Sequence, residues 1–430
     1  MTKAGDKVKI TTKDETIEGI LMPNEETDSV IMKLNNGYNI GIEKDEVKRI
    51  EKVGEGNALI ISHAKKIKKS PKLPNITILH TGGTIASKVD YKTGAVYSSF
   101  KPEDLLGMFP ELEEIANFDS KLISNMWSDD LRFKHFEVIA KEIEKEVKKG
   151  VDGIIIGIGT DNLAVASAAL AFIIEETPIP IILVGAQRSS DRGSSDAAMN
   201  LICAAEFIAK TDFAGVAICM HEKMDDKTSA IMPACKTAKL HSSRRDAFKV
   251  VNDSIIARIN YEIKKIDFLK EYPKKDRKNL IIKPKMEEKV ALLKIHINMF
   301  PEQFEFFKGY KGLVIEGTGL GHTPGQVPND ICSIHKKIYP AIKSVIDSGC
   351  IVVMTTQCLF GRVQMHVYSK GTDLANLGVV SGEDMLPNTA LVKLSWLLGN
   401  YEGKEEIKRL IQINLRGEIN PRIEPAQYVE

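Results

Sequence analysis

A short apolar run leads into a turn rich in threonine and glycine in the stretch Ile76-Thr-Ile-Leu-His-Thr-Gly-Gly-Thr-Ile-Ala86. The run Ile76–Leu79 is typical of a buried strand, and two glycines after it permit a sharp turn and a close approach of a ligand to the backbone. In an open parallel sheet, ligands bind beyond the carboxyl ends of the strands. A threonine hydroxyl there can act as a nucleophile when a base removes its proton. The alternative is that Thr81 and Thr84 only cap the turn.

Downstream of this stretch, apolar runs alternate with segments of helical periodicity. Further strands are expected at 154–158, 179–184, 216–219, 290–295, 312–315 and 351–354, and helices at 133–147, 163–174, 340–348 and 387–398. This alternation predicts an α/β protein with mainly parallel sheets covered on both faces. The lysine-rich stretch 260–289 has little periodicity, which favours one domain over residues 75–270 and a second over 290–430.

Residues 1–52 have a different pattern and predict a small all-β barrel of the SH3 or Sm type. Val8 and Ile10 alternate with lysines, and Asn36-Gly37 indicates a tight hairpin turn. Nine basic and eleven acidic residues give this part a charge of −2, which argues against direct binding of RNA. Residues 53–74 are expected to be a linker, and its run of lysines favours either a solvated segment or contact with a polyanion.

Composition places the whole chain in the ordinary globular range. Of 430 residues, 43% are apolar and 27% charged, and the net charge is +1, which argues against broad electrostatic binding of nucleic acid. The six cysteines form no CxxC pair and the nine histidines no metal-ligand pattern, so no metal site is expected. The N-terminus lacks the apolar core of a signal peptide, and the longest apolar run, 163–174, is too short to span a membrane. We therefore expect a reduced, cytoplasmic protein without membrane contact.

Polar side chains also follow the second expected strand. Gly157-Ile-Gly-Thr160-Asp161 places a carboxylate beside a hydroxyl, which can orient it or hold an α-ammonium group, although Asp161 can also be a helix N-cap. Lys239 can serve as a base if its surroundings lower its proton affinity, but a lysine is more often a surface residue. Ser128, in Trp127-Ser-Asp-Asp130, can donate a hydrogen bond to a carboxylate.

Taken together, these motifs resemble the bacterial-type L-asparaginase family. The segments that carry the resemblance, in order, are Thr81–Ala86, Ser128–Asp130, Gly159–Asp161 and Lys239–His241. A more specific likeness is to the archaeal GatD family of glutamyl-tRNA(Gln) amidotransferases, an asparaginase-like glutaminase preceded by a small barrel. His241–Phe248, Gly317–His322 and Gly382–Pro387 carry this second likeness, together with the N-terminal barrel that ordinary asparaginases lack.

The resemblance implies specific roles for the catalytic residues. Thr84 is then the first nucleophile, and the backbone N–H groups around Gly83 are candidate donors to the developing oxyanion. Thr160, Lys239 and Asp161 form a second, triad-like group, in which Lys239 takes a proton from Thr160 or from its bound water.

The resemblance also implies how substrate is held. Ser128 binds the α-carboxylate of the substrate and Asp161 its α-ammonium group. Tyr97 matches the mobile-loop tyrosine of the family by spacing, although Tyr91 competes for that assignment. Asp129 stands where the family commonly has glutamine, so we count it as a substrate-binding candidate whose role is open.

The expected function is therefore that of an amidohydrolase within an amidotransferase. It hydrolyses glutamine and passes ammonia to a partner chain, GatE, which holds the ATP, magnesium and tRNA sites and amidates Glu-tRNA(Gln). No cofactor is expected in this chain, and the assembly is expected to contain a homodimer of it within a heterotetramer of two GatD and two GatE chains. The alternatives are a free-standing L-asparaginase and a non-catalytic module that binds an anion at Thr81–Thr84.

Overall fold

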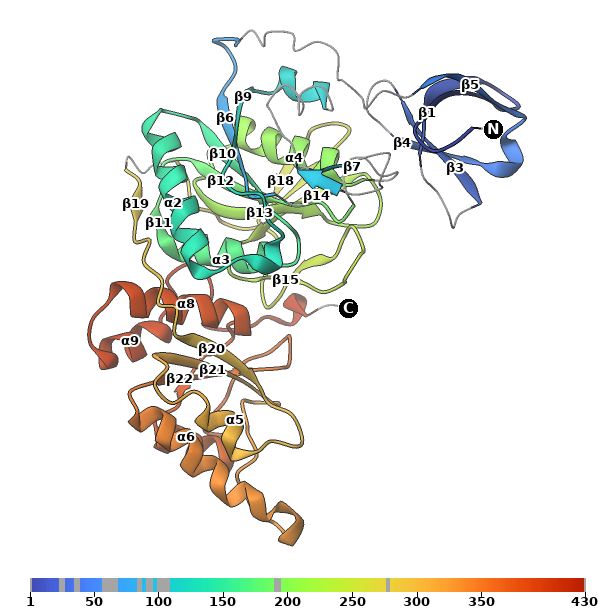
Figure 1. Cartoon of the computed structure of the whole chain (residues 1–430). Coiled ribbons are helices and arrows are strands. Elements are labelled where there is room, and N and C mark those ends of the chain that lie inside the picture. Colours follow the sequence, from blue (N-terminus) through green and yellow to red (C-terminus); the bar gives the residue numbers. More distant parts are fainter. Residues whose placement is uncertain are drawn as a thin grey trace.

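The structure is a computed structural model that describes residues 2–22, 28–34, 39–55, 69–82, 87–89, 96–98, 109–188, 195–275 and 279–428. Figure 1 shows three regions in chain order. An N-terminal β-structure stands to one side, a large α/β region forms the middle, and a smaller α/β region forms the opposite end.

Five short antiparallel strands build the N-terminal region, in the order β4-β3-β2-β1-β5. They are β1 (Asp6–Thr11), β2 (Thr16–Leu21), β3 (Ser29–Leu34), β4 (Asn39–Glu43) and β5 (Arg49–Glu55). Val8 and Ile10 alternate with half-exposed lysines and pack with Met32 and Ile42 into a separate small core. The predicted all-β region is confirmed, and it curls into a barrel-like form in Figure 1. Its last strand continues to Glu55, past the expected end at residue 52, and the Asn36-Gly37 turn lies outside the described residues.

The middle region contains an eight-stranded sheet in the order β18-β17-β14-β13-β12-β10-β6-β9. Its strands are β6 (Asn75–His80), β9 (Asn117–Leu122), β10 (Gly153–Gly157), β12 (Pro180–Val184), β13 (Gly215–His221), β14 (Thr228–Pro233), β17 (Ala257–Asn260) and β18 (Ile266–Phe268). From β9 to β13 the pairs are parallel, as predicted. From β13 to β18 they are antiparallel. The lysine-rich stretch expected to separate two domains therefore contributes an edge strand to this sheet.

Helices cover both faces of the parallel strands. The helices are α2 (Phe133–Lys148), α3 (Leu163–Ile173) and α4 (Ala197–Lys210). In β10, Ile154 and Ile156 pack into the same core as α2 and α3, whereas Ile155 packs into the core of α4. Because successive side chains of a strand point to opposite faces, a strand between two helical layers must be apolar at every position. The unbroken run Ile154–Ile156 meets that requirement.

The C-terminal region repeats this design with a four-stranded parallel sheet, in the order β20-β21-β22-β23. Its strands are β20 (Val290–Lys294), β21 (Gly312–Gly317), β22 (Ile351–Thr356) and β23 (Val380–Ser381). Its helices are α5 (Pro301–Glu305), α6 (Ile338–Asp347), α7 (Ser369–Leu377), α8 (Pro387–Asn400) and α9 (Lys404–Ile411). Short remaining elements are η1 (Lys44–Glu46), η3 (Pro110–Glu114), β11 (Ile174–Glu176), β19 (Ile281–Ile282), η5 (Asp330–Lys337) and η6 (Pro425–Gln427).

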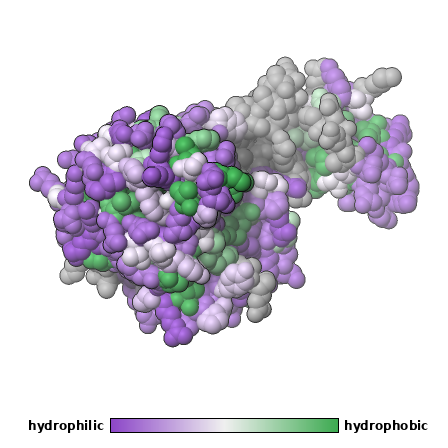
Figure 2. Space-filling view, turned by 90° about the horizontal axis from the view of Figure 1, so that it is seen from below, coloured by the Kyte–Doolittle hydropathy of each residue, from purple (hydrophilic) through white to green (hydrophobic). Residues whose placement is uncertain are grey.

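Helix α8 joins the two α/β regions, because it packs on α3 of the middle region as well as on its own sheet. The ring of Trp396 in α8 stacks on Phe172 in α3 with centroids 5.7 Å apart, and both lie in one continuous core. The face shown in Figure 2 is mostly hydrophilic, with apolar residues in scattered groups. Among the helices of the described residues, none combines the length and the apolar character that a membrane span requires.

Candidate active site

Three neighbouring strands of the middle sheet end at the same edge and lead into the candidate site. Thr81 follows β6, Thr160 lies beyond β10, and Gln187 lies beyond β12. The ladder continues past the strand ends, since the N–H of Thr81 donates to Gly157 O at 3.0 Å. The carboxyl ends of these parallel strands therefore bring residues from three separate sequence segments to one edge.

Lys239 contacts both residues of the Thr160-Asp161 pair. Its Nζ donates to Thr160 Oγ1 at 2.9 Å and to Asp161 Oδ1 at 2.8 Å. The Lys239 side chain is 15% exposed and that of Asp161 68%. A hydroxyl, an amine and a carboxylate in sequence have the geometry of a nucleophile, a base and an orienting group. The structure thus brings together three of the four predicted catalytic residues, while their roles stay predictions.

A β-hairpin carries Lys239 to this position. It consists of β15 (Thr237–Lys239) and β16 (Phe248–Val250), and Lys239 pairs with the buried Phe248 at the end of the ladder. The N–H of Leu240 donates to Ala247 O at 2.7 Å and extends the pairing beyond the strands. Lys239 is therefore a largely buried residue with two partners, and the alternative of an ordinary surface lysine is wrong.

Ser128 lies beside the Thr160 segment, in the short helix η4 (Ser128–Asp130). Its Oγ accepts a hydrogen bond from the N–H of Asn162 at 3.3 Å, and its carbonyl accepts one from Asn162 Nδ2 at 2.8 Å. Gly159 permits this approach, because a Cβ at residue 159 would lie 2.8 Å from Ser128 Oγ. Ser128 is buried, whereas Asp129 is exposed to solvent.

The residue before α3 settles the alternative interpretation of Asp161. Helix α3 begins at Leu163, and its N-cap position is occupied by Asn162. Asp161 is therefore not the N-cap of this helix, and its carboxylate accepts a hydrogen bond from Lys239 instead.

The turn after β6 is shaped by Gly82, whose φ of +100° is a left-handed conformation that L side chains rarely adopt. A Cβ at residue 82 would lie 2.7 Å from Met126 O, so the segment after β9 packs directly on this turn. The N–H of Met126 also donates to Thr81 O at 3.0 Å. This packing fixes the start of the predicted nucleophile loop.

The rest of that loop cannot be placed against the site. Gly83, Thr84 and Tyr91 lie outside the described residues, and Tyr97 lies in β8 (Val96–Ser98), opposite Lys88 of β7 (Ser87–Val89). The nucleophile role of Thr84 and the choice between the two tyrosines remain predictions.

Gln187 is a site residue that sequence reasoning missed. Its Oε1 lies 3.5 Å from Thr160 Oγ1. The buried carboxylate of Asp196 holds its loop, since it accepts hydrogen bonds at 3.0 Å from the N–H groups of Gln187 and Arg188. The available signal was its place just after the third strand, in the same relation to its strand as Thr160.

Metal ligands do not gather in the part of the chain that the structure describes. No group of three or more His, Cys, Asp and Glu residues within it could hold an ion. The cysteines are all free thiols, four of them buried. The candidate chemistry is therefore that of hydroxyl, amine and carboxylate groups.

Three protein-family profiles match the chain and cover most of it. They are "GatD N-terminal domain" over residues 2–53, "Asparaginase, N-terminal" over 75–273 and "Glutaminase/Asparaginase C-terminal domain" over 289–411. A Pyrococcus furiosus protein named as the GatD chain of glutamyl-tRNA(Gln) amidotransferase is 44% identical, over 99% of this chain and 97% of its own length. A Methanococcus maripaludis protein of the same name is 43% identical, over 97% of this chain and 98% of its own.

The chain belongs to the GatD family of glutamyl-tRNA(Gln) amidotransferases. Solved structures agree with the family's asparaginase-like fold. The thermostable L-asparaginase from Thermococcus kodakarensis superposes with a TM-score of 0.70 at 28% identity, over 81% of this chain and all of its own. L-asparaginase I from Vibrio cholerae gives 0.69 at 27% identity, over 81% and 99%. The predicted family and the predicted fold class are confirmed.

Proposed function

We propose that the chain is the glutaminase component of a tRNA-dependent amidotransferase. It hydrolyses the side-chain amide of glutamine, and the ammonia serves a partner that converts Glu-tRNA(Gln) to Gln-tRNA(Gln) with ATP. The observation that carries the proposal is the contact of Lys239 with both Thr160 and Asp161, at the carboxyl edge of an asparaginase-like sheet. The match of residues 2–53 to the GatD N-terminal profile distinguishes the chain from an asparaginase.

The proposed reaction proceeds through an acyl-enzyme. The Thr84 hydroxyl attacks the amide carbon, its proton goes to the leaving nitrogen, and ammonia departs as the C–N bond breaks. Water then cleaves the ester and releases glutamate, with the hydroxyl regenerated. The Thr160, Lys239 and Asp161 group moves the protons, and the N–H groups near Gly83 hold the oxyanion, each such donor contributing roughly 3 kcal/mol to the transition state.

Substrate recognition is assigned to groups flanking that reaction centre. Ser128 binds the α-carboxylate and Asp161 the α-ammonium group of glutamine. Asp129, exposed at the surface of the same short helix as Ser128, adds a negative charge near the ammonium end.

The partner in this proposal is GatE, in a heterotetramer of two copies of each chain around a homodimer of this one. ATP and magnesium act in the partner, and most of the affinity for tRNA resides there. The charge of −2 on residues 1–52 supports this division, because phosphate contacts require a cationic face. The N-terminal domain then orients the glutaminase within the complex.

A first experiment compares ammonia release from glutamine by the isolated chain and by the chain with GatE, ATP and Glu-tRNA(Gln). Thr84→Ala and Thr160→Ala should each lower turnover by at least about 100-fold with an unchanged circular dichroism spectrum. Thr177→Ala is the matched control, because this buried threonine bonds within its own turn, through Ile179 O. Near-normal turnover in either site variant would remove that residue from the mechanism.

A second experiment tests the N-terminal domain. Its last strand ends at Glu55, so the deletion should remove residues 2–55. Basal glutamine hydrolysis should persist, while more glutamine is consumed for each Gln-tRNA formed. An unchanged ratio would contradict the positioning role, and tight, salt-sensitive binding of tRNA by residues 2–55 alone would contradict the assignment of tRNA affinity to the partner.

The free-standing asparaginase is the second candidate, favoured by the structural match to L-asparaginases. It predicts that asparagine is the better substrate and that GatE with Glu-tRNA(Gln) has no effect on turnover. Stimulation of glutamine hydrolysis by that mixture would exclude it.

A further inference from the structure

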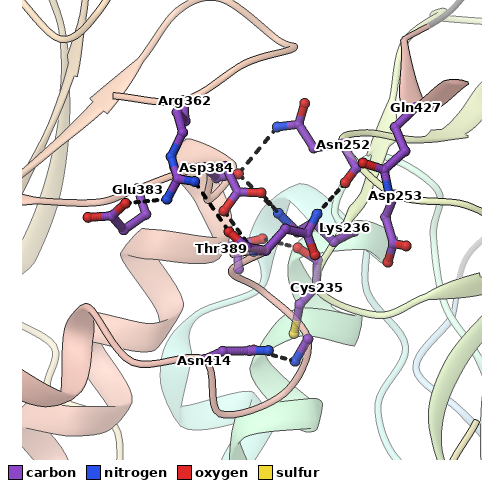
Figure 3. A network of polar contacts seen from close by, with 12 residues as sticks. Cys235, Lys236, Asn252, Asp253, Arg362, Glu383, Asp384, Thr389, Asn414 and Gln427 are labelled. Carbon is purple, nitrogen blue, oxygen red and sulfur yellow. Dashed lines mark hydrogen bonds and ion pairs between the residues drawn. The ribbon is translucent and has the colours of Figure 1, made fainter. Parts of the chain in front are cut away.

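The base of the hairpin that carries Lys239 is bound to the C-terminal region at both of its strands. Lys236 immediately precedes β15, and Asn252 lies just beyond β16. Figure 3 shows both side chains facing Asp384, which comes from the C-terminal region. The catalytic lysine and the residues that hold its hairpin thus belong to one element with two attachments.

The first attachment is a fully buried ion pair. Lys236 Nζ donates to Asp384 Oδ2 at 2.5 Å and to Asp384 O at 3.2 Å, and both side chains are 0% exposed. Asp384 Oδ1 accepts a further hydrogen bond from the N–H of Asn420 at 3.0 Å. The backbone of the residue before Lys236 is held as well, since Thr389 Oγ1 in α8 donates to Cys235 O at 3.0 Å. A lysine is buried this completely only when a partner compensates its charge.

The second attachment is a reciprocal pair of hydrogen bonds. Asn252 Nδ2 donates to Gly361 O at 2.9 Å, and the N–H of Gly361 donates to Asn252 Oδ1 at 3.0 Å. Asn252 adopts a φ of +56°, a left-handed conformation that is uncommon outside glycine. Such a backbone persists only where surrounding contacts determine it.

These two attachments bear on the separation between Lys239 and Thr160. Thr160 belongs to the middle sheet, whereas the strand that carries Lys239 starts at a residue fixed to the C-terminal region. Lys236 and Lys239 are three positions apart on an extended chain, or roughly 10 Å. A displacement of the attached end is therefore passed along a short, hydrogen-bonded strand to the catalytic amine.

We propose that Lys236, Asp384 and Asn252 are positioning residues through which the C-terminal region sets the place of Lys239 against Thr160. The proposal rests on the proposed glutaminase activity for its kinetic consequences. Its geometric consequence, the distance between Lys239 Nζ and Thr160 Oγ1, does not depend on that activity.

The test replaces both members of the ion pair, because removing one would leave an uncompensated buried charge. Lys236→Met with Asp384→Asn is compared with Lys393→Met with Glu418→Gln. The control pair is equally buried at 0% exposure of both side chains and has an N···O distance of 2.5 Å. Its lysine bonds to the carbonyls at positions 411 and 413 rather than to the hairpin.

We expect the Lys236/Asp384 variant to fold, and its turnover of glutamine to fall about 10- to 100-fold relative to the control, with KM changed less than about twofold. A misplacement of a catalytic group by about 1 Å has an effect of this size. In crystal structures, the separation of Lys239 Nζ and Thr160 Oγ1 should lengthen beyond hydrogen-bond distance in this variant and stay near 2.9 Å in the control.

A second variant keeps the test decisive if the first fails to fold. Asn252→Gly accepts the same backbone conformation but removes the side-chain bonds to Gly361, and it should lengthen the same separation and lower turnover in the same direction. A separation and a turnover equal to those of the control in a folded variant would overturn the proposal. If the parent chain hydrolyses no glutamine, the proposed function fails, and the crystallographic separations still decide the positioning role.

Discussion

Replacing Lys239 with methionine should separate catalysis from stability. Methionine keeps most of the aliphatic stem but loses the hydrogen bonds to Thr160 and Asp161. Loss of a general base costs about 100- to 10,000-fold in turnover, or about 3 to 5 kcal/mol of transition-state stabilisation. The effect on folding should be small, because the Asp161 side chain is 68% exposed and such pairs contribute about 1 kcal/mol or less.

The assay measures ammonia release and thermal unfolding on the same preparations. Turnover should fall at least about 100-fold while Tm changes by less than about 4 °C. Lys249→Met is the matched control, because Lys249 lies on the other strand of the same hairpin and bonds to Glu222 O and Asp246. It should retain turnover close to that of the parent, since its hydrogen bonds go to these two residues and not to Thr160.

Arginine at position 239 tests whether the amine must give up its proton. A guanidinium stays charged near neutral pH, so Lys239→Arg should be as damaging as Lys239→Met. Turnover close to that of the parent in Lys239→Arg would refute the base assignment and show that positive charge alone suffices there.

Three further substitutions have structure-based outcomes. Gly185→Ala places a Cβ 2.9 Å from Thr160 Cγ2, so it should lower turnover about 10- to 100-fold with little change in KM, and an unchanged turnover would show that Thr160 tolerates displacement. Gly159→Ala places a Cβ 2.8 Å from Ser128 Oγ, so it should instead raise KM for glutamine by about tenfold or more, whereas a lower turnover at unchanged KM would contradict carboxylate binding by Ser128. Burial lowers the pKa of His221 from its ordinary 6.5, so the unfolded chain takes up the proton more readily and this contribution to stability is lost as pH falls below about 6.5. Urea unfolding of His221→Gln and the parent should therefore converge between about pH 7 and pH 5, and a constant gap would contradict it.

The parallel core was predictable because its determinants are local. Ile154–Ile156 and the helical apolar repeat of α2 are patterns within single elements, and burial on both faces requires just such runs. The antiparallel extension through β17 and β18 was not predicted, because these strands have few residues and β18 is only partly buried. Their place in the sheet is set by pairing with β14 rather than by their own composition.

The site was predictable to the extent that a family likeness connects distant motifs. Thr160 and Asp161 follow a strong strand, and position alone marks them as candidates. Nothing local to Lys239 predicts that it meets them, since 78 residues separate it from Asp161 and its hairpin is short. Gln187 was missed for the same reason, because its relation to Thr160 exists only once two parallel strands are side by side.

Lys236 shows where sequence reasoning ends most clearly. Composition predicts that a lysine is exposed, and the polar hairpin that follows it carries further basic residues. Its burial depends on Asp384, which lies 148 residues away, in a different region of the fold, and neither charge is stable in that place without the other. A charge can be moved into a core only where both partners arrive together, so the pair forms when the two α/β regions dock and not before. The catalytic hairpin is therefore completed by tertiary assembly, and the position of Lys239 is a property of the docked regions rather than of the strand that contains it.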